Sequence, residues 1–446
     1  MLSVLAFLLF CATCTVLAFV RHPIYGLYFY LAAIYVHPPS RWWADMIPDL
    51  RWALLSAAVT AAAIIVNRNK LARRPHWLAN APAVLLGLYA LWMWIQSPWA
   101  LDGEAHLNGS IQYTKYLIAF WFVYRLIDTK ELLRGFLLAH VAGCGLLGIF
   151  CFFAGRSDGR LDGVGGPGMD DANTLGMYLA TAAVVCAGLI LSQTGWRRYF
   201  SLAAMAFILN GIVLTNTRGA MLGLVAGMLV LTVGKARKHR RQFWVLAILG
   251  VVSLGAIVDD SFIKRMNTIG DVASQDEDAD MSARSRVVIY EAQVRMFLAY
   301  PMGSGHRGTA ALSASYMDRK WLTTGKDGDA SNAARSSHNT FMTTLVEQGI
   351  PGAVMFISLV FWTLAVIMRI RRWNSPTDDP ELTTLAASVF GAIVVVLVAG
   401  VATDFLMAEV QFWLYAVLVC LLQLRQARTV PVVDASSLPA FAVRRA

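Results

Sequence analysis

Long apolar stretches recur along the chain, and short polar connections separate them. Most of the stretches are close to the about 20 residues that an α-helix needs to cross the hydrocarbon core of a bilayer. The thirteen candidate spans are 3–20, 23–37, 51–66, 79–97, 110–126, 132–154, 172–192, 198–215, 218–233, 242–258, 340–369, 382–402 and 406–424. The pattern therefore predicts an all-α, polytopic integral membrane protein.

Basic residues gather in alternate connections, and this sets the expected orientation. Short loops rich in Lys and Arg mark the cytoplasmic side of a membrane protein. On this rule the cytoplasmic loops are 67–78, 127–134, 193–198, 234–241 and 369–381. The external loops are 98–109, 155–171, 215–218, 259–339 and 403–408. The C-terminal tail is expected on the cytoplasmic side.

The number of crossings depends on the first three stretches, which leaves the side of the N-terminus open. Thirteen crossings would place the N-terminus outside. Residues 23–37 are short and end in His37-Pro38-Pro39, so they are the best candidate for a half-helix. We therefore predict about twelve membrane-spanning helices. The predicted parts are an N-terminal bundle (1–258), an external loop (259–339), C-terminal helices (340–424) and a cytoplasmic tail (425–446).

One external connection, residues 259–339, is far longer than the usual loop of a compact domain. Its first part, 271–280, is acidic, and we expect it to be mobile. Residues 284–300 are expected to form a helix that lies against the membrane or the bundle and stops at the turn PMGSG (301–305). The polar residues 336–339 then predict a cap for the next helix.

Composition narrows the class of protein further. Apolar residues make up 57% of the chain and charged residues 15%, which excludes an ordinary soluble enzyme and a disordered protein. The basic clusters behind the net charge of +10 sit in short connections, so they indicate topology and contact with membrane lipids, not nucleic-acid binding. All six cysteines lie in apolar stretches, so we expect neither a disulfide framework nor a cysteine metal site.

The sequence has no nucleotide-binding, zinc-protease or serine-hydrolase motif. The remaining candidates for catalytic chemistry include two ionisable residues at external helix ends. Arg218 begins a helix, where it either anchors that helix at the interface or binds a phosphate or diphosphate with its guanidinium fork. His338 precedes another helix, where it is either structural, capping together with Asn339, or a proton acceptor near neutral pH.

Further polar residues surround these two in the external loops. Three arginines flank the acidic stretch, either as surface ion-pair partners or as an electropositive rim over a cavity mouth. They are Arg265, Arg284 and Arg286. The glycine-rich loop 159–173 is either a flexible hairpin or a backbone lid over a polar ligand. The contacts of such a lid are Arg160, Asp171 and Asn173. The acidic spacing matches no calcium loop, so no metal is expected.

Four segments follow one another in a fixed order around the long external loop. They are NTRGAMLG (216–223), RMNTIGDVASQDEDADMSARSRVVIY (265–290), YPMGSG (300–305) and SHNTFMTTLVEQGIPG (337–352). Together they resemble the O-antigen ligase and polymerase superfamily of bacterial inner membranes, closest to O-antigen ligases and exosortase-associated O-glycosylation ligases. The loop GPGMDDAN (166–173) is similar to a further motif that usually has two adjacent asparagines, and Ala172 here replaces the first.

The resemblance implies a glycosyltransferase that moves a glycan from an undecaprenyl-diphosphate carrier to an acceptor hydroxyl at the periplasmic face of the inner membrane. In ligases the acceptor is a terminal sugar of the lipid A core. The implied catalytic residues are His338, which acts as the general base, and Arg218 and Arg286, which stabilise the leaving diphosphate. The expected reaction is a single displacement with inversion at the donor sugar, and it needs no metal or cofactor. The expected substrate-binding residues are Arg265, Arg284, Arg160, Asn173 and Asn339.

Three alternatives stay open at this point. An O-antigen polymerase shares the chemistry but uses another carrier-linked glycan as acceptor, and a protein O-oligosaccharyltransferase uses a protein. A lipid-linked glycan transporter instead predicts inverted repeats and ionisable groups at mid-bilayer, for which His140 and Asp404 are the nearest candidates. Because the polar residues cluster at one face, we favour an enzyme over a transporter.

Overall fold

The computed structural model describes residues 2–156, 161–235, 237–258, 277–322, 334–373 and 378–429, together with Ile263. For residues 253–254, 256–257, 277–286 and 427–429 the description extends to the backbone only. The main helices are α1 Leu2–Val20, α2 Ile24–Val36, α3 Trp52–Val66, α4 Ala81–Gln96, α5 Gly103–Leu126, α6 Lys130–Ala154, α7 Ala172–Ser192, α8 Trp196–Thr215, α9 Arg218–Gly234, α10 Arg240–Ile257, α12 Glu277–Ala299, α13 Gly308–Tyr316, α14 Thr340–Arg371, α15 Pro380–Ala399 and α16 Glu409–Thr429.

Each of the thirteen predicted apolar stretches is helical over most of its length. Among the described residues, six helices are long and apolar enough to cross a membrane, namely α1, α6, α7, α8, α14 and α15. Helix α9 joins them if it is counted together with the segment that follows its 119° bend. With 13 residues, α2 is about 20 Å long and cannot cross a core of about 30 Å. A helical membrane protein is thus confirmed, whereas the total of about twelve crossings stays a prediction.

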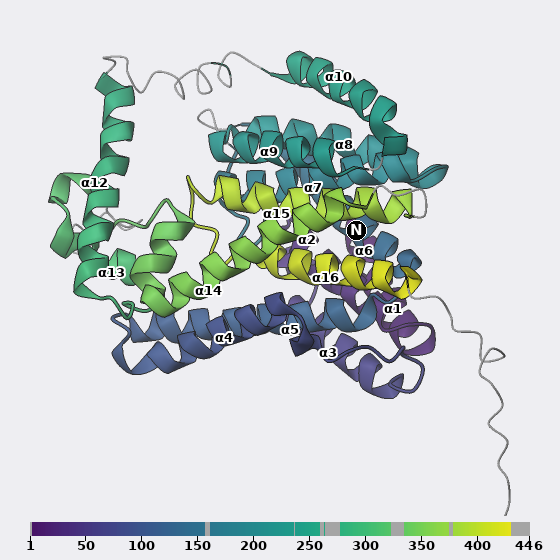
Figure 1. The fold of residues 1–446 in the computed structure, drawn as a ribbon, viewed down its shortest axis with the longest axis horizontal. Coiled ribbons are helices and arrows are strands. Elements are labelled where there is room, and N and C mark those ends of the chain that lie inside the picture. The colour runs from purple at the N-terminus through teal and green to yellow at the C-terminus, as the bar shows by residue number, and fades with distance from the viewer. Residues whose placement is uncertain are drawn as a thin grey trace, which may run out of the picture.

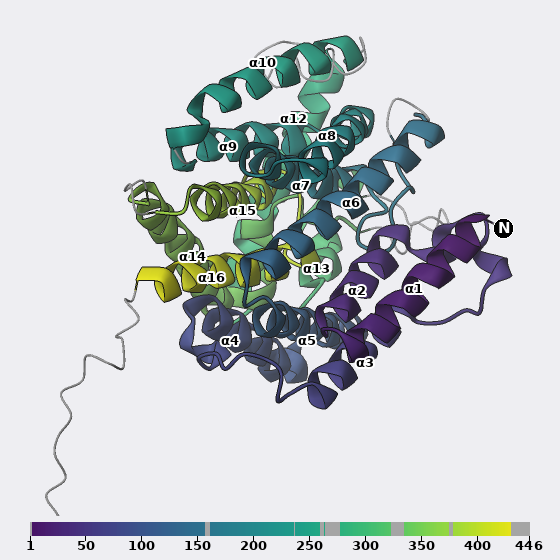
Figure 2. The same cartoon turned by 90° about the vertical axis from the view of Figure 1, so that its right-hand side faces the viewer.

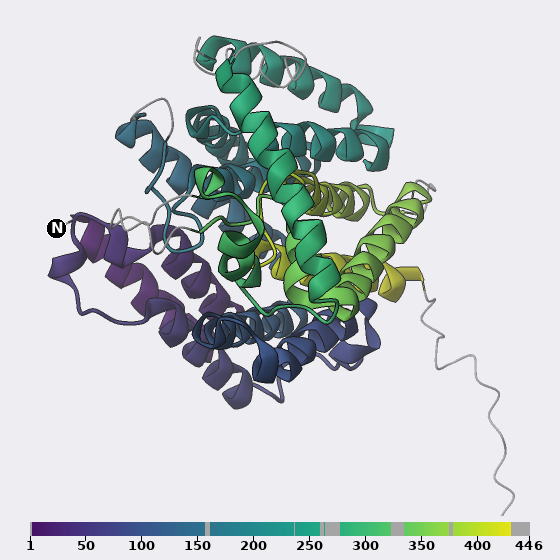
Figure 3. The same ribbon diagram turned by 90° about the vertical axis from the view of Figure 1, so that its left-hand side faces the viewer.

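The bundle helices run side by side, and α12 stands across one end of them (Figure 1). In that view α4, α5, α15 and α16 lie roughly along the horizontal and α14 crosses them obliquely, while α12 and α13 occupy the left-hand side. Seen from there, α12 crosses in front of the bundle (Figure 3). Seen from the other side, α1, α2 and α3 form a group at one edge (Figure 2). We call the side with α12 and α13 the α12 end and the other side the opposite end.

A stripe of glycines lets α9 pack closely against α15. The spacing of Gly219, Gly223 and Gly227 predicts such packing, because small residues let two helix backbones approach. A Cβ added at Gly223 would lie 2.9 Å from the carbonyl oxygen of Val395, and one at Gly227 would be similarly close to α15. The prediction is confirmed, and the close packing fixes Arg218, the first residue of α9, beside the end of α15.

The helix predicted in the long loop is longer than expected. It begins at Glu277, seven residues before the predicted start, so residues 277–280 of the acidic stretch are helical. Residues 271–276 lie outside the described part of the chain.

The buried face of α12 packs against the bundle, as the sequence predicts. Ile289, Ala292 and Met296 form an apolar cluster with Leu312 of α13 and Val346 of α14. This cluster attaches the long loop to the end of the bundle. The loop is therefore a fixed part of the α12 end where α12 and α13 contact α14.

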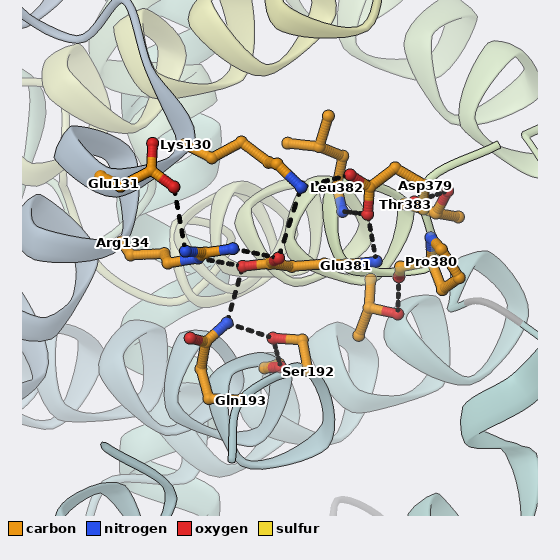
Figure 4. Close-up of polar contacts among 12 residues, drawn as sticks. Lys130, Glu131, Arg134, Ser192, Gln193, Asp379, Pro380, Glu381, Leu382 and Thr383 are labelled. Carbon is orange, nitrogen blue, oxygen red and sulfur yellow. Dashed lines mark hydrogen bonds and ion pairs between the residues drawn. The ribbon is translucent and has the colours of Figure 1, made fainter. Parts of the chain in front are cut away.

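At the opposite end an ion-pair network joins the ends of three helices (Figure 4). Arg134 of α6 binds both carboxylate oxygens of Glu381 at the start of α15, and Lys130 contacts Asp379. The side-chain amide of Gln193, just after α7, donates to Glu381 at 2.7 Å. The network connects three of the loops that the charge pattern predicts to be cytoplasmic.

Candidate functional site

The break in α14 receives the PMGSG turn, so two of the sequence motifs form one structural unit. Gly349 has a φ of +63° inside the helix and Pro351 follows it. A Cβ at Gly349 would lie 2.4 Å from the amide nitrogen of Gly303, so only glycine permits this approach. The backbone hydrogen bonds across the contact run from Ser304 to Val346 (3.0 Å), from Gly305 to Glu347 (2.9 Å) and from Ile350 to Pro301 (2.9 Å).

Polar side chains of α4 and α5 hold this unit from the other side. The amide of Gln96 donates to the carbonyl oxygens of Met302 (3.0 Å) and Glu347 (3.2 Å). His106 is buried, and its Nδ1 accepts the backbone N–H of His306 at 2.9 Å. The turn is therefore fixed by two helices that are distant from it in the sequence, and this fixes the directions of His306 and Glu347.

A polar cavity of about 860 Å³ lies at the α12 end, beside this unit. It is bounded by the starts of α5, α7 and α13, by the first part of α14 and by the connection between α15 and α16. Its polar lining consists of Asp102, Glu104, Asn108, Gln112, Thr174, His306, Arg307, Thr309, Ser336, Ser337, Glu347 and Asp404. Four of these side chains are carboxylates, and within the described lining only two are basic.

Glu347 is the most buried carboxylate of the cavity, at 4% exposed. It accepts the backbone N–H groups of Arg307 (2.9 Å) and Thr309 (3.4 Å). Its Oε2 lies 3.4 Å from Nδ1 of His306. Burial lowers the pKa of His306, but the neighbouring carboxylate of Glu347 outweighs this, so the pKa lies above its usual value. The pair therefore holds a proton more readily than a free imidazole does.

Asp404 also lines the cavity, from the connection between α15 and α16. Burial, followed by the proximity of the Glu347 carboxylate, raises the pKa of Asp404 to about 7. The backbone N–H of Leu406 donates to Asp404 at 3.0 Å and partly offsets this. The sequence singled out Asp404 as a candidate for an ionisable group at mid-bilayer, but the structure places it in a connection at the α12 end. His140 is fully buried within α6.

Among the predicted site residues, His338 adjoins the cavity through its neighbour. Ser337 lines the cavity, and its hydroxyl accepts a hydrogen bond from Gln293 of α12 at 2.8 Å. Asn339 caps α14, because its side chain accepts the N–H groups of Phe341 (2.9 Å) and Met342 (3.1 Å). The cap predicted at this position is confirmed. His338 is exposed between these two anchored residues.

Arg218 lies at the same end, on the first residue of α9, and is half-buried. Asn216 before it takes a left-handed conformation with φ of +51°, and this reverses the chain between α8 and α9. The hydroxyl of Thr217 donates to the carbonyl of Ala172 at 3.1 Å, so the start of α9 is attached to the start of α7. Arg218 does not line the described cavity.

The other predicted residues divide into three groups. Arg284 and Arg286 lie on α12, for which only the backbone is described at these positions. Arg160 and Arg265 lie outside the described residues. In the glycine-rich loop, Asp171 caps α7, and Asn173 is half-buried in the first turn of that helix. Gly168 and Thr174, on either side of them, line the cavity.

The cavity also contains residues that the sequence did not single out as site residues. His306 directly follows the PMGSG turn, and Glu347 lies inside the fourth motif. A carboxylate within an apolar helix is a detectable signal. The hydroxyl of Thr309 offers no such signal, because only the packed structure shows it to be buried.

A second hollow, an apolar groove of about 1390 Å³, lies between α1, α2 and α6. Arg41 lines it, with its guanidinium 4.1 Å from the centroid of the Phe150 ring, and donates to the carbonyl of Val164 at 2.9 Å. Val164 lines the groove, whereas Gly168 lines the polar cavity. The loop 161–171 therefore lies between an apolar hollow and a polar one.

No metal site is evident in the part of the chain that the structure describes. Within it, no group of three or more His, Cys, Asp or Glu side chains lies close enough to hold a metal ion. All six cysteines are buried and free.

Comparison with known proteins bears on the four motifs directly. Residues 203–357 match the family model described as O-Antigen ligase, and this range contains all four motif segments. The resemblance to the O-antigen ligase and polymerase superfamily is confirmed. The chain is also 24% identical over 318 residues, 67% of its length and 69% of the relative's, to the exopolysaccharide production protein ExoQ of Rhizobium meliloti (strain 1021). Both matches support a ligase- or polymerase-type enzyme of polysaccharide biosynthesis in a multi-pass membrane protein.

Proposed function

We propose that the protein is a glycosyltransferase of the O-antigen ligase type. It transfers a glycan from undecaprenyl-diphosphate to a terminal sugar hydroxyl of the lipid A core, at the periplasmic face of the bacterial inner membrane. The observation that carries this proposal is the meeting of two motif segments at the α12 end: the PMGSG turn packs into the break in α14, and Ser337 and Glu347 of the fourth segment line the polar cavity beside it. The arrangement supports transfer between two sugar-bearing substrates.

In the proposed reaction His338 accepts the proton of the acceptor hydroxyl. The acceptor oxygen attacks the anomeric carbon of the donor sugar, and the bond from that carbon to the diphosphate oxygen breaks with inversion. Arg218 and Arg286 stabilise the negative charge that develops on the leaving diphosphate, with Arg265, Arg284 and Arg160 as further contacts. This chemistry uses an already activated donor and needs no metal or cofactor.

The apolar groove between α1, α2 and α6 provides a surface for a lipid chain close to the cavity. Its lining is formed mainly by aromatic and aliphatic side chains, and the loop that borders it, at Val164, leads to Gly168 and Asn173 near the polar cavity. A lipid-linked sugar needs both environments, because its chain and its glycan differ in polarity. The neighbouring hollows therefore support a lipid-linked substrate.

The proposal is tested by reconstituting the full-length protein in liposomes with a purified undecaprenyl-diphosphate glycan and lipid A core. We expect glycan-bearing lipid A core and free undecaprenyl diphosphate as products, detected by mass spectrometry, in a chelator and without ATP. Failure to transfer, or transfer only when Mg²⁺ or Mn²⁺ is restored, would contradict the proposed metal-independent ligase.

A polymerase is the second candidate function, because the relative's name concerns exopolysaccharide production. In that case the acceptor is another carrier-linked glycan and the chemistry of His338 and the arginines is the same. The reconstitution separates the two: with donor alone, a polymerase lengthens the glycan on its carrier, whereas a ligase leaves the glycan length unchanged. A protein acceptor is examined in the same assay by replacing lipid A core with a candidate protein.

A further inference from the structure

The cavity wall contains a buried hydroxyl that has no partner in the described structure. Thr309 is 1% exposed and lines the cavity, and its Oγ1 finds no hydrogen-bond partner among the described residues. A buried polar group without a partner is costly, and native proteins rarely keep one without a reason. Because Thr309 is part of a cavity wall, a ligand in the cavity can supply the missing partner.

Glu347 lies next to this hydroxyl and also has hydrogen-bonding capacity left. A carboxylate can accept about four hydrogen bonds. The described structure gives it two backbone donors, Arg307 and Thr309, and a contact to His306 at 3.4 Å. The free capacity of Glu347 and the hydroxyl of Thr309 together match a ligand with adjacent hydroxyl groups, which offers donors and acceptors close together.

The charge of the cavity decides which part of a substrate it can hold. Four carboxylates line it, against His306 and the exposed Arg307 within the described lining. Such a wall repels a diphosphate and any other anion, because like charges in a partly desolvated site are unfavourable. The uncharged, hydroxyl-rich part of a substrate is the part that fits.

We propose that this cavity is a subsite for a neutral or amino-bearing sugar of the acceptor, bound through Glu347 and Thr309, and that it rejects acidic sugars. The assignment to the acceptor rests on the proposed function, because Ser337 lines the cavity and the base His338 follows it directly. At about 860 Å³ the cavity is within the range of about 300–1,000 Å³ that is usual for small-ligand sites.

The subsite is tested by binding, without any transfer step. Full-length protein in nanodiscs is mixed with methyl glucoside, methyl glucosaminide or methyl glucuronide, and binding is measured by saturation-transfer NMR. We expect the first two to bind and the glucuronide to bind at least about tenfold more weakly, because one charge–charge contact near a protein surface exceeds 1.4 kcal/mol. Glucuronide binding equal to that of the glucoside would overturn the proposed selectivity.

Thr309→Val is the decisive variant, because it removes the hydroxyl and keeps the shape and the backbone N–H that Glu347 accepts. We expect it to fold with unchanged or higher thermal stability and to bind the glucoside about 3–10-fold more weakly, the effect of one lost neutral hydrogen bond. A loss of stability together with unchanged binding would show a structural hydroxyl and overturn the proposal. Glu347→Gln is a second test of the subsite, and we expect it to bind the glucoside more weakly than the unchanged protein does.

Asp318→Asn is the matched control, because Asp318 is exposed on the same end of the protein and does not line the described cavity. It should bind all three glycosides like the unchanged protein. Failure of the subsite and failure of the proposed function give different results. If Thr309→Val transfers the glycan normally and its acceptor KM is unchanged, the subsite is rejected and the proposed function is not. Specific glycoside binding without transfer to any acceptor would reject the proposed function and leave the subsite in place.

Discussion

The two ends of the bundle both bury carboxylates, but they treat them in opposite ways. At the opposite end Glu381 is bound by Arg134 and by Gln193, and Asp379 contacts Lys130. At the α12 end Glu347 has only His306 beside it as a cation, and Asp404 forms no ion pair within the described part of the chain. The carboxylates of the opposite end are neutralised by neighbouring basic side chains, whereas carboxylates around the cavity at the α12 end are not.

The pKa values of the two aspartates express this difference. Burial raises the pKa of Asp379, but its contact with Lys130 and the backbone N–H groups of α15 outweigh burial, so the pKa lies below the usual value. For Asp404 burial dominates and the pKa is about 7. A buried charge that loses its partner destabilises a fold strongly, and groups with perturbed pKa values cluster at functional sites. This contrast supports the proposed placement of the chemistry at the α12 end and a structural role for the opposite end.

The largest expected effect is an all-or-none difference in labelling between the two ends. Ser315 on α13 and Asn69 between α3 and α4 are both exposed, and all native cysteines are buried. In spheroplasts an impermeant thiol reagent should label Ser315→Cys and should reach Asn69→Cys only after lysis, because the charge pattern places the α12 end outside. The reverse result would invert the predicted topology.

Replacement of the base should be the next largest effect. His338→Ala is expected to insert and to bind the donor normally while transfer falls by about 10²–10⁴-fold, the usual contribution of a positioned base. Single-turnover transfer at saturating acceptor measures it. Near-native turnover would exclude His338 as the base, and loss of donor binding would make it a diphosphate contact instead.

Removal of one cation at the opposite end should affect stability and not chemistry. Arg134→Ala leaves the half-buried Glu381 without its two-nitrogen contact, which is expected to cost about 3 kcal/mol. The thermal midpoint in detergent should fall, while transfer per folded molecule stays the same. A selective loss of transfer at unchanged midpoint would break the division between the two ends.

The arginines of the proposed site should act on donor use. Arg218→Ala and Arg286→Ala each remove a charge-assisted contact of about 1.5–3 kcal/mol and should weaken use of the diphosphate donor accordingly. Lysine should restore little, because it lacks the planar fork. Donor titrations of the four variants measure this, and full activity of Arg218→Lys would contradict a two-nitrogen contact at that position.

A pair of stability changes of opposite sign is also expected. Because the pKa of Asp404 is raised in the folded protein, ionisation of this group lowers the free energy of unfolding as the pH rises from about 4 to about 7. Asp404→Asn should therefore be more stable than the unchanged protein at pH 8 and equally stable at pH 4. Asp379 has a lowered pKa and stabilises the fold above the pKa of the unfolded chain, an effect lost as the pH falls through its folded value. Asp379→Asn should therefore be less stable at pH 8.

Thermal unfolding followed by tryptophan fluorescence at the two pH values measures both variants. A difference of about 1 kcal/mol corresponds to about 1–3 °C in a chain of this size. If both aspartates change stability in the same direction at pH 8, the contrast between the two ends is wrong.

The site was only partly predictable from the sequence, and particular residues show why. The order of the motifs indicated His338, Asn339 and Arg218, because each precedes or begins an apolar stretch at an external end. His306 and Asp404 lie 98 positions apart in the chain, and no local pattern indicates that both line one cavity. The start of α12 was also placed too late, because a run of acidic residues in a sequence resembles a solvated segment.

What the sequence by itself determined is the set of helices, since a long apolar stretch can satisfy its backbone hydrogen bonds in a membrane only as a helix. It also determined the glycine stripe that brings α9 against α15. The tertiary structure alone decided which carboxylates are paired and which are left around a cavity. The physical reason is that pairing depends on which helix ends meet, as with Arg134 and Glu381, and this is fixed by packing between segments far apart in the chain.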